Sequence, residues 1–306
     1  MNQSEPIRIG LPVFNGEPHL QDAIESLLHQ TYENFQIFVV DNASTDGTSE
    51  IIQRYAQKDS RIKYFRQNQW LKATANWNRT YALAAPGVRF FMWASDDDLF
   101  AKDYIESLLA PLLEHSRVVL SFPQVDVIDQ EGKIVGHLYQ KSFPGGRNSF
   151  ERIRSIIRCG RFSAIYGLLR TDAIRWNPVI ADTTFGSDLW FLLRLATAGD
   201  FCLIERPLFF KRMGGISETR DDPSTSYDPL KTWNIGPKEW RLFCDLEISY
   251  LAKLYMFYRL KLLGKAFYPQ NKTIDWFLLP MFWSYILWKN PRFFGFRTKL
   301  KSYLHL

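Results

Sequence analysis

Apolar residues follow two different periods along the first hundred positions of the chain. Short apolar runs at 7–14, 35–40, 62–65 and 89–93 have the length and composition of buried strands. Between these runs, apolar residues recur every three or four positions, which predicts helices around 20–28, 51–56 and 74–85. Strands that alternate with helices predict an α/β fold, with a doubly wound, mostly parallel sheet flanked by helices.

Polar residues follow three of the predicted strands at the point where each strand ends. Asn15 comes after the first strand, Asp41 after the second and Asp96 after the fourth. The carboxyl ends of parallel strands meet at one edge of a sheet, and ligands bind at that edge in doubly wound folds. We therefore expect these side chains to gather around a binding site.

The second hundred residues are less regular. Runs at 118–122 and 124–128 predict strands followed by a hairpin turn at 129–132, and 207–211 predicts a further strand. Helical stripes cover 150–159 and 189–198. The segment 218–238 is rich in Ser, Thr, Asp and Pro, which suggests a linker or a lid, and a long helical pattern follows at 238–263.

The C-terminal segment is basic and aromatic. From 251 to 306 there are ten Lys and Arg and one acid, a balance of +9 against +6 for the whole chain, so the other 250 residues carry about −3. The apolar, Trp-rich run at 276–288 is shorter than the roughly 20 residues that span a bilayer. This composition favours a helical tail at a phospholipid surface over nucleic-acid binding, and the alternative is a hairpin packed on the core.

The N-terminal residues and the cysteines point to a cytoplasmic protein. The first six residues have neither a basic nor an apolar region typical of a signal peptide. The three cysteines are widely spaced, which argues against a disulfide framework and a cysteine-based zinc site. Together with the tail, these features predict a cytoplasmic protein that is peripheral at the inner face of a membrane.

The run Asp96, Asp97 and Asp98 is the sharpest local signal for chemistry. Adjacent carboxylates repel one another, and a hard cation such as Mg²⁺ or Mn²⁺ would relieve that repulsion. The alternative is a solvated acidic turn that caps the next helix. Asp41 and Asp188 also have two interpretations each, because both precede helices that they could simply cap.

Several motifs in fixed order resemble the family 2 glycosyltransferases. The sequence has no G-x-G-x-x-G and no Walker loop, so the fingerprints of dinucleotide-binding and P-loop enzymes are absent. The resemblance covers roughly residues 7–220 and is most specific over the first hundred. It rests on the segments 11–17 (LPVFNGE), 27–32 (LLHQTY) and 39–48 (VVDNASTDGT), on Asn68 and Asn76, on the acidic run at 96–98 and on Ser187-Asp188.

The resemblance implies a GT-A fold and an inverting, hexosyltransferase-like enzyme that uses a nucleoside-diphosphate sugar, often a UDP sugar. It implies that 1–115 is the nucleotide-sugar-binding half, 116–220 the acceptor-binding half and 221–306 a linker and membrane-proximal tail. The acceptor would be a saccharide or a lipid-linked molecule, in the assembly of a polysaccharide or glycolipid, and the cofactor Mn²⁺ or Mg²⁺.

The resemblance also assigns roles to individual residues. Asp188 would be the general base, and Asp97 the chief metal ligand, with Asp96 and Asp98 beside it. Asp41 would accept a hydrogen bond from the uracil ring, and Arg212 would clamp the phosphates. The other residues expected at the nucleotide are Pro12, Val13, Phe14, Asn15, Asn76 and Asp96.

Two departures from the family pattern keep a second hypothesis open. The family commonly has an acid two positions before Asp96, where this chain has Ala94. The family also often carries a histidine after its last strand, and the segment 211–217 has none. The alternative is therefore a degenerate, non-catalytic relative that binds nucleotide and serves as a scaffold in polysaccharide assembly.

Overall fold

The computed structural model describes residues 4–139, 148–159, 162–182 and 186–213. The expected linker at 218–238, the helix at 238–263 and the aromatic run at 276–288 lie outside the described residues. Within the described ranges, every helix is too short or too polar to cross a bilayer.

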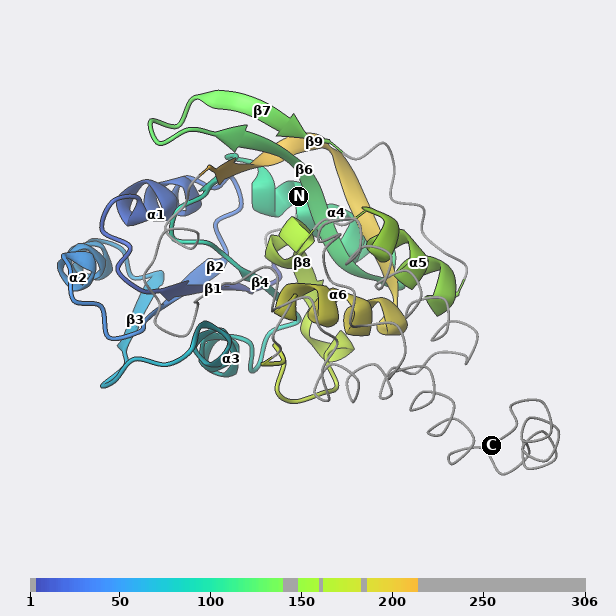
Figure 1. Ribbon diagram of the computed structural model, residues 1–306, viewed down its shortest axis with the longest axis horizontal. Coiled ribbons are helices and arrows are strands. Elements are labelled where there is room, and N and C mark those ends of the chain that lie inside the picture. Colours follow the sequence, from blue (N-terminus) through green and yellow to red (C-terminus); the bar gives the residue numbers. More distant parts are fainter. Residues whose placement is uncertain (1–3, 140–147, 160–161, 183–185, 214–306) are drawn as a thin grey trace, which may run out of the picture.

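A single nine-stranded sheet runs through the described part of the chain (Figure 1). Its strands lie in the order β3-β2-β1-β4-β8-β6-β9-β5, and β7 pairs with β6 outside this path. The strands are β1 (Ile7–Val13), β2 (Phe35–Asp41), β3 (Ile62–Arg66), β4 (Phe90–Trp93), β5 (Leu99–Phe100), β6 (Val118–Ile128), β7 (Ile134–Leu138), β8 (Leu168–Arg170) and β9 (Asp200–Arg212).

The sheet is parallel in its first half and mixed in its second. β3, β2, β1 and β4 are all parallel neighbours, so their carboxyl ends share one edge. β8 is antiparallel to both β4 and β6, and β9 returns parallel to β6. The two halves expected at 1–115 and 116–220 are thus joined by continuous strand pairing.

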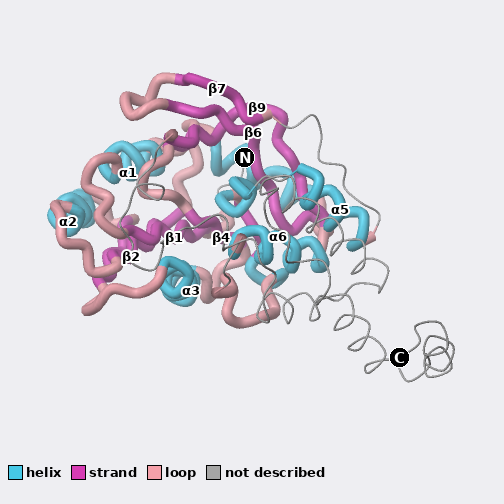
Figure 2. Tube along the Cα trace, in the orientation of Figure 1, coloured by secondary structure: helices cyan, strands magenta, loops and turns pink. Residues whose placement is uncertain are grey.

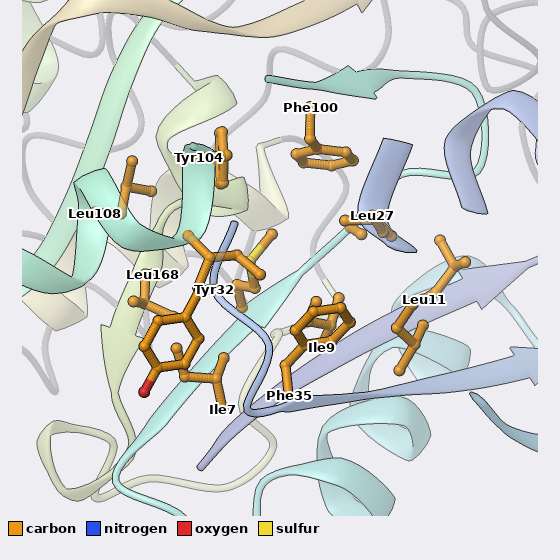
Figure 3. Packing of buried hydrophobic residues seen from close by; sticks show 14 of the residues in the cluster. Ile7, Ile9, Leu11, Leu27, Tyr32, Phe35, Phe100, Tyr104, Leu108 and Leu168 are labelled. Carbon is orange, nitrogen blue, oxygen red and sulfur yellow. The ribbon is translucent and has the colours of Figure 1, made fainter. Parts of the chain in front are cut away.

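Helices cover both faces of the sheet (Figure 2). They are α1 (Leu20–Leu28), α2 (Thr48–Lys58), α3 (Ala73–Ala84), α4 (Tyr104–Glu114), α5 (Ser149–Cys159) and α6 (Ser187–Ala198), with short 3₁₀ turns at Phe162–Tyr166 and Thr171–Ala173. α1 and α4 pack on one face, in the core that includes Ile7, Ile9 and Tyr104 (Figure 3). α3, α5 and α6 cover the opposite face. This is the layering expected of a doubly wound sheet.

β4 contributes side chains to the hydrophobic cores on both faces of the sheet. Its residues are all buried, and alternate side chains point to opposite faces of a strand. Phe90 and Met92 enter the core beside α1 and α4, whereas Phe91 and Trp93 enter the core beside α3 and α6. A strand buried on both faces has no polar alternation, which explains the continuous apolar run in the sequence.

α3 lies unusually close to the sheet because β1 carries glycine beneath it. A Cβ atom added at Gly10 would lie 2.6 Å from the Thr80 Cγ2 atom of α3, so only glycine fits without a shift. α3 in turn lines the cleft at the carboxyl edge of the sheet. A buried glycine thereby sets the position of one wall of the candidate site.

The predicted elements of the first hundred residues are confirmed within one or two residues at their ends, except that α2 begins three residues before the predicted stretch at 51–56. The predicted strands at 118–122 and 124–128 form one strand, β6, whose pairing with β9 shifts register next to Pro123. The predicted hairpin turn after it is confirmed, with Gly132 at a φ of 84°. The strand predicted at 207–211 is the second part of β9.

Candidate functional site

The loops that follow β1 and β2 are interlocked by side-chain hydrogen bonds. The Asn15 N–H donates to Ser44 Oγ at 2.9 Å, and the Thr45 N–H donates to Asn15 Oδ1 at 2.9 Å. Asn15 and Ala43 have positive φ angles of 50° and 59°. Left-handed backbone at non-glycine residues is costly and is concentrated at functional sites. The two loops therefore form one preorganised rim at the carboxyl edge.

The residues expected to line a nucleotide lie at this rim, but not all through their side chains. Pro12, Phe14 and Asn15 are partly exposed at the end of β1. Val13 is 1% exposed and belongs to the core, so only its backbone is available, and its carbonyl already accepts the Asn42 N–H at 2.8 Å.

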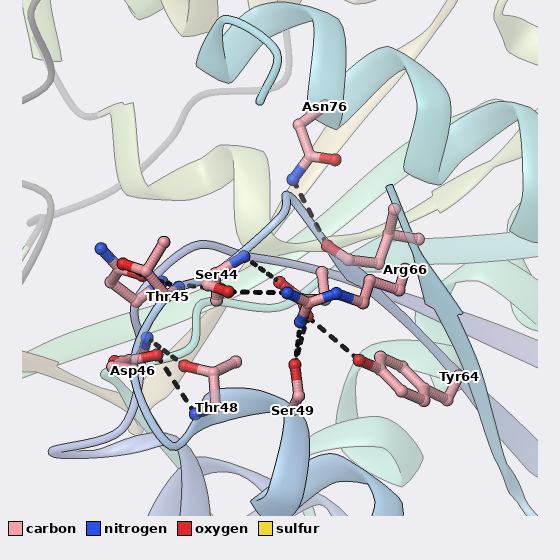
Figure 4. A network of polar contacts seen from close by, with 12 residues as sticks. Ser44, Thr45, Asp46, Thr48, Ser49, Tyr64, Arg66 and Asn76 are labelled. Carbon is pink, nitrogen blue, oxygen red and sulfur yellow. Dashed lines mark hydrogen bonds and ion pairs between the residues drawn. The ribbon is translucent and has the colours of Figure 1, made fainter. Parts of the chain in front are cut away.

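Asp41 has no exposed area, and the chain itself fills its hydrogen-bonding capacity. Figure 4 labels its partners Ser44, Ser49, Tyr64 and Arg66. Its Oδ1 accepts the Ser44 N–H at 2.8 Å. Its Oδ2 accepts the hydroxyls of Ser49 at 2.9 Å and Tyr64 at 3.0 Å and the Arg66 Nη1 at 2.6 Å. No face of the carboxylate is open in this arrangement, and the expected contact between Asp41 and a uracil ring stays a prediction.

The Asp41 carboxyl nevertheless favours its ionised form. Burial alone would raise the pKa of this carboxyl, but hydrogen bonds from Ser44, Ser49 and Tyr64 outweigh it and lower the pKa below its ordinary value. Asp41 is thus a buried anion at neutral pH, and Arg66 is its cationic partner.

Asn76 also lies deeper than the sequence suggested. It is 3% exposed, and its Nδ2 donates to the Val40 carbonyl at 3.4 Å, directly before Asp41 (Figure 4). The Asn76 Oδ1 has no hydrogen-bond partner among the described residues. Asn76 thus joins α3 to the end of β2, and its expected place near the nucleotide stays a prediction.

The acids Asp96, Asp97 and Asp98 are all buried, and their environments differ. Asp96 lies beside Gly16 in the loop between β1 and α1, since a Cβ added at Gly16 would lie 3.0 Å from its Oδ2. Asp97 accepts a hydrogen bond from the Ser95 hydroxyl, and Asp98 Oδ1 accepts the Arg212 N–H at 2.8 Å. Only Asp97 and Asp98 line the same cleft. The described residues contain no three-ligand cluster of His, Cys, Asp or Glu, and the expected metal site at Asp96, Asp97 and Asp98 stays a prediction.

Two carboxylates still fit a divalent metal of the kind that the resemblance implies. Burial and the neighbouring Asp97 carboxylate raise the pKa of Asp98 to about 7. The chain therefore places too little positive charge beside Asp98 to offset its burial and the repulsion from Asp97. Mg²⁺ is commonly bound by one or two carboxylates together with substrate phosphates. Asp97 and Asp98 are the residues whose electrostatics a cation would satisfy.

Arg212, the expected phosphate clamp, is committed elsewhere. Its side chain is 1% exposed, and its Nε donates to the Asp97 carbonyl at 2.9 Å. Its Nη1 donates to the carbonyls of Asp129 and Gln130 at 2.9 and 2.6 Å. Arg212 also lines the cleft described below, and its role as a phosphate clamp stays a prediction. Arg212 ties the acidic loop to the turn between β6 and β7.

A cleft of about 290 Å³ opens at the carboxyl edge and brings together segments that are far apart in the sequence. Its walls include α3, the acidic loop, the 3₁₀ turn at Phe162–Tyr166, the start of α6 and the end of β9. Its charged lining residues are Asp97, Asp98, Asp188, Lys211 and Arg212. The rings of Trp77 and Tyr166, 5.8 Å apart, supply an aromatic wall.

Asp188 lies in this cleft in the first turn of α6. Gly186, with a φ of 62°, is the N-cap of the helix, so Asp188 does not have the capping position that was its simpler interpretation. Its Oδ1 accepts the Leu189 N–H at 2.8 Å. Burial raises the pKa of Asp188, while the Leu189 hydrogen bond and the charge of Lys211 act in the opposite direction. A carboxylate with a raised pKa in a cleft is suited to accept a proton.

Lys211, Trp77, Tyr166 and Arg66 were not singled out by sequence reasoning. Lys211 is within reach of the electrostatics of both Asp98 and Asp188, and lowers the pKa of each. A lysine inside a predicted strand and an aromatic residue inside a predicted helix carry no local signal of function. Only the folding of distant segments onto one cleft identifies them.

Comparison with known proteins gives a family and a fold. The family model described as glycosyl transferase family 2 matches residues 9–167, more than half of the chain. An uncharacterized glycosyltransferase of Rickettsia bellii is 31% identical over 231 residues, which are 74% of this chain and 30% of the relative. The putative teichuronic acid biosynthesis glycosyltransferase TuaG of Bacillus subtilis is 30% identical over 123 residues, 40% of this chain and 47% of the relative.

Solved structures resemble this chain in fold. Residues 1–349 of Staphylococcus aureus TarS, in complex with UDP-GlcNAc, superpose with a TM-score of 0.69 at 16% identity, over 87% of this chain and 74% of that one. GalNAc-T7 with UDP, GalNAc and Mn²⁺ gives a TM-score of 0.54 at 12% identity, over 68% of this chain and 44% of that one. The matched region is about a third of the length of the Rickettsia relatives.

Proposed function

This chain belongs to glycosyl transferase family 2 and has a GT-A fold, and from that membership we propose that it transfers a sugar from a UDP-sugar to a hydroxyl group of a saccharide or lipid-linked acceptor. The observation that carries the proposal is the cleft, in which Asp188 lies with Asp97, Lys211 and the aromatic wall. Turnover of a UDP-sugar by the full chain is the experiment that tests it.

The cleft has the groups that an inverting transfer needs. The Asp188 carboxylate takes the proton of the acceptor hydroxyl as that oxygen forms a bond to the anomeric carbon. The bond from the anomeric carbon to the donor's diphosphate breaks, and its electron pair leaves with the nucleoside diphosphate. Attack from the face opposite the leaving group inverts the anomeric centre. The rings of Trp77 and Tyr166 provide apolar surface for a sugar ring.

The diphosphate end of the donor belongs at the acidic loop. Lys211 supplies positive charge beside Asp98 and Asp188, where phosphate oxygens would otherwise meet carboxylates. Asp97 and Asp98 would hold Mn²⁺ or Mg²⁺, which when bound neutralises charge on the diphosphate. Asp96, beside Gly16 in the loop after β1, would meet the ribose, and the backbone of the segment 12–15 would meet the nucleoside.

The relatives support the donor class and the biological setting. TarS is solved with UDP-GlcNAc and with UDP, and TuaG is named for teichuronic acid biosynthesis. We therefore place the proposed reaction in the assembly of a surface polysaccharide or glycolipid. The second candidate is the degenerate, non-catalytic scaffold, which Ala94 and the commitment of Arg212 to backbone carbonyls favour. It predicts nucleotide binding without turnover.

The tail is the basis for a proposed peripheral position at the inner face of a membrane, although it lies outside the described residues. Its +9 balance and the aromatic run at 276–288 suit an anionic phospholipid surface. We expect the full chain to sediment with anionic vesicles, and not with neutral ones, at moderate salt. Removal of residues 265–306 should abolish sedimentation while UDP binding persists. Equal sedimentation of the two forms would count against membrane contact through the tail.

A further inference from the structure

A second cavity lies at the other end of α6 from the cleft. Its volume is about 510 Å³, and its walls include the end of β8, the 3₁₀ turn at Thr171–Ala173 and the last turn of α6 (Figure 1). The cleft is lined by Ser187 and Asp188 of the first turn of α6, whereas this cavity is lined by Thr197 and Ala198 of the last. At a rise of 1.5 Å per residue the two ends are about 16 Å apart, so the cavity is separate from the cleft.

Arginines dominate the charge of this second cavity. Its lining includes Arg170, Arg175 and Arg194 but only one acid, Asp172, and we call it the arginine cavity. Within the described part of the chain, Asp172 forms no ion pair with any of the three. Like charges that are gathered around one cavity repel one another unless an anion offsets them. The composition of the lining therefore favours an anionic ligand.

Arg170 is a buried charge that is held by carbonyl oxygens. It is 9% exposed, its Nε donates to the Val118 carbonyl at 2.8 Å, and its Nη2 donates to the carbonyls of Leu112 and His115. Among the described residues, no carboxylate forms an ion pair with Arg170 and no acceptor bonds to its Nη1. Buried charges are normally paired with an opposite charge. The Nη1 of Arg170 thus keeps two N–H donors for an anion in the arginine cavity.

A simpler role for the arginines would be to bond the last carbonyls of α6. Arg152 of α5 already has this role, because its Nε donates to the Ala196 carbonyl at 2.7 Å and its Nη2 to the Thr197 carbonyl at 3.4 Å. Arg175 is exposed and makes no hydrogen bond or ion pair within the described ranges. The end of α6 therefore does not account for the place of Arg175 at the cavity.

The other groups of the arginine cavity suit the oxygens of a phosphate. Arg194 lies with its guanidinium carbon 5.7 Å from the centre of the Trp176 ring, and this contact restricts its orientation. Ser116 adds a hydroxyl to the lining, and a hydroxyl can donate to a phosphate oxygen. A guanidinium donates two parallel hydrogen bonds to a phosphate, which a lysine cannot do.

We propose that the arginine cavity binds the phosphate group of a phosphomonoester or phosphodiester, at a site separate from that of sugar transfer. Arg170 and Arg175 supply the donors that have no other partner in the described part of the chain, and Arg194 adds a third guanidinium. Soluble phosphorylated compounds and phospholipid head groups both carry this group. The inference does not rest on the proposed function, because none of these arginines takes part in it.

The first test is calorimetric titration of the full chain with inorganic phosphate at low ionic strength, where charge interactions are least screened. The paired variant Arg175→Gln/Arg194→Gln should raise the dissociation constant roughly tenfold or more, since it removes hydrogen bonds to a charged ligand. The matched control is Arg54→Gln/Arg79→Gln, which removes the same charge from exposed positions of α2 and α3. Its dissociation constant should stay within about twofold of the wild-type value.

A third variant distinguishes the arginine cavity from the cleft. Phosphate bound in the cleft would depend on Lys211, which lies there beside the acids. Loss of phosphate binding in Lys211→Gln, with binding retained in the paired variant, would place the ion in the cleft and overturn the proposal. Equal affinities of wild type and the paired variant would also overturn it.

A chemical footprint on wild type avoids any effect of substitution on folding. Phenylglyoxal modifies accessible guanidinium groups, and mass spectrometry of peptides measures the modification of each arginine. Phosphate should slow the modification of Arg175 and leave that of Arg79 unchanged, because both are exposed but only Arg175 lines the cavity. No protection of Arg175, or equal protection of both, would contradict a phosphate site here.

Sedimentation with phosphatidylcholine vesicles that contain phosphatidic acid separates the two sources of phosphate. The segment 214–306 is the same in every variant, so its contribution to vesicle binding cancels. Weaker sedimentation of the paired variant than of wild type and the control supports a lipid head group in the cavity. Equal sedimentation, together with weaker binding of inorganic phosphate by the paired variant, supports a soluble phosphorylated ligand. A wild type that does not bind inorganic phosphate at low ionic strength overturns the proposal.

Discussion

Replacement of Asp188 by asparagine is expected to lower kcat for sugar transfer by roughly 10²- to 10⁴-fold, the usual contribution of a general base. Asparagine keeps the size of the side chain and the acceptor for the Leu189 N–H, but it cannot take a proton. UDP affinity should stay within about twofold, because the proposed role of Asp188 is toward the acceptor hydroxyl and not toward the nucleotide. Transfer kinetics and UDP calorimetry on the same preparations measure both quantities.

The pH dependence of the wild type gives this prediction a second readout. A general base is active when deprotonated, and burial raises the pKa of Asp188 above its ordinary value. The rate should therefore rise with pH through that raised pKa, on the alkaline side of where an exposed aspartate titrates. Asp188→Asn should lose this limb, whereas Asp172→Asn, an exposed acid outside the cleft, should keep it. A similar rate and profile in Asp188→Asn would remove Asp188 from the chemistry.

The second large effect is expected at Asp97. Asp97→Ala removes one of the two carboxylates that line the cleft at the acidic loop. We expect turnover to fall by roughly 10²-fold or more, the size of effect seen when one electrostatic stabiliser of a leaving group is removed. We also expect the strengthening of UDP binding by Mn²⁺ to disappear. Calorimetry with UDP, in Mn²⁺ and in chelator, measures the second effect without any acceptor.

The same variant distinguishes catalysis from folding. The Asp97 carbonyl, which accepts from Arg212 Nε, is backbone and survives the substitution. The contact of the acidic loop with β9 should therefore persist, and the melting temperature in chelator should not fall. An Asp97→Ala chain that binds UDP with full Mn²⁺ dependence would show that the metal, if any, is held elsewhere.

The course of the backbone in the first hundred residues could be predicted because its signals are local. β1 and β4 are short apolar runs, and α1 shows its apolar face at every third or fourth residue. β8, with three residues, and β5, with two, are too short to show any period. Their antiparallel pairing depends on contacts with strands that are distant in the sequence, and a local sequence pattern carries no information on such contacts.

The site was predictable in its location and less so in its detail. The acidic run at 96–98 was expected at the carboxyl edge, and its members Asp97 and Asp98 line one cleft with Asp188, which the family resemblance singled out. Which charges face that cleft depends on tertiary partners. Arg212 is taken up by three backbone carbonyls, Asp41 is covered by Arg66, and Lys211 is the residue of this strand end that acts on the cleft acids. No spacing in the sequence distinguishes a buried arginine from an exposed one.

The most direct test of the proposed function is donor hydrolysis by the full chain across UDP-, GDP- and dTDP-sugars with Mn²⁺. Water replaces the acceptor in this assay, so the unknown second substrate is not needed. We predict turnover of one UDP-sugar by wild type, with loss of turnover in both Asp97→Ala and Asp188→Asn. Binding of UDP without turnover of any donor would contradict an active transferase and favour the non-catalytic scaffold. Turnover that persists in both variants would contradict the cleft as the site of the reaction.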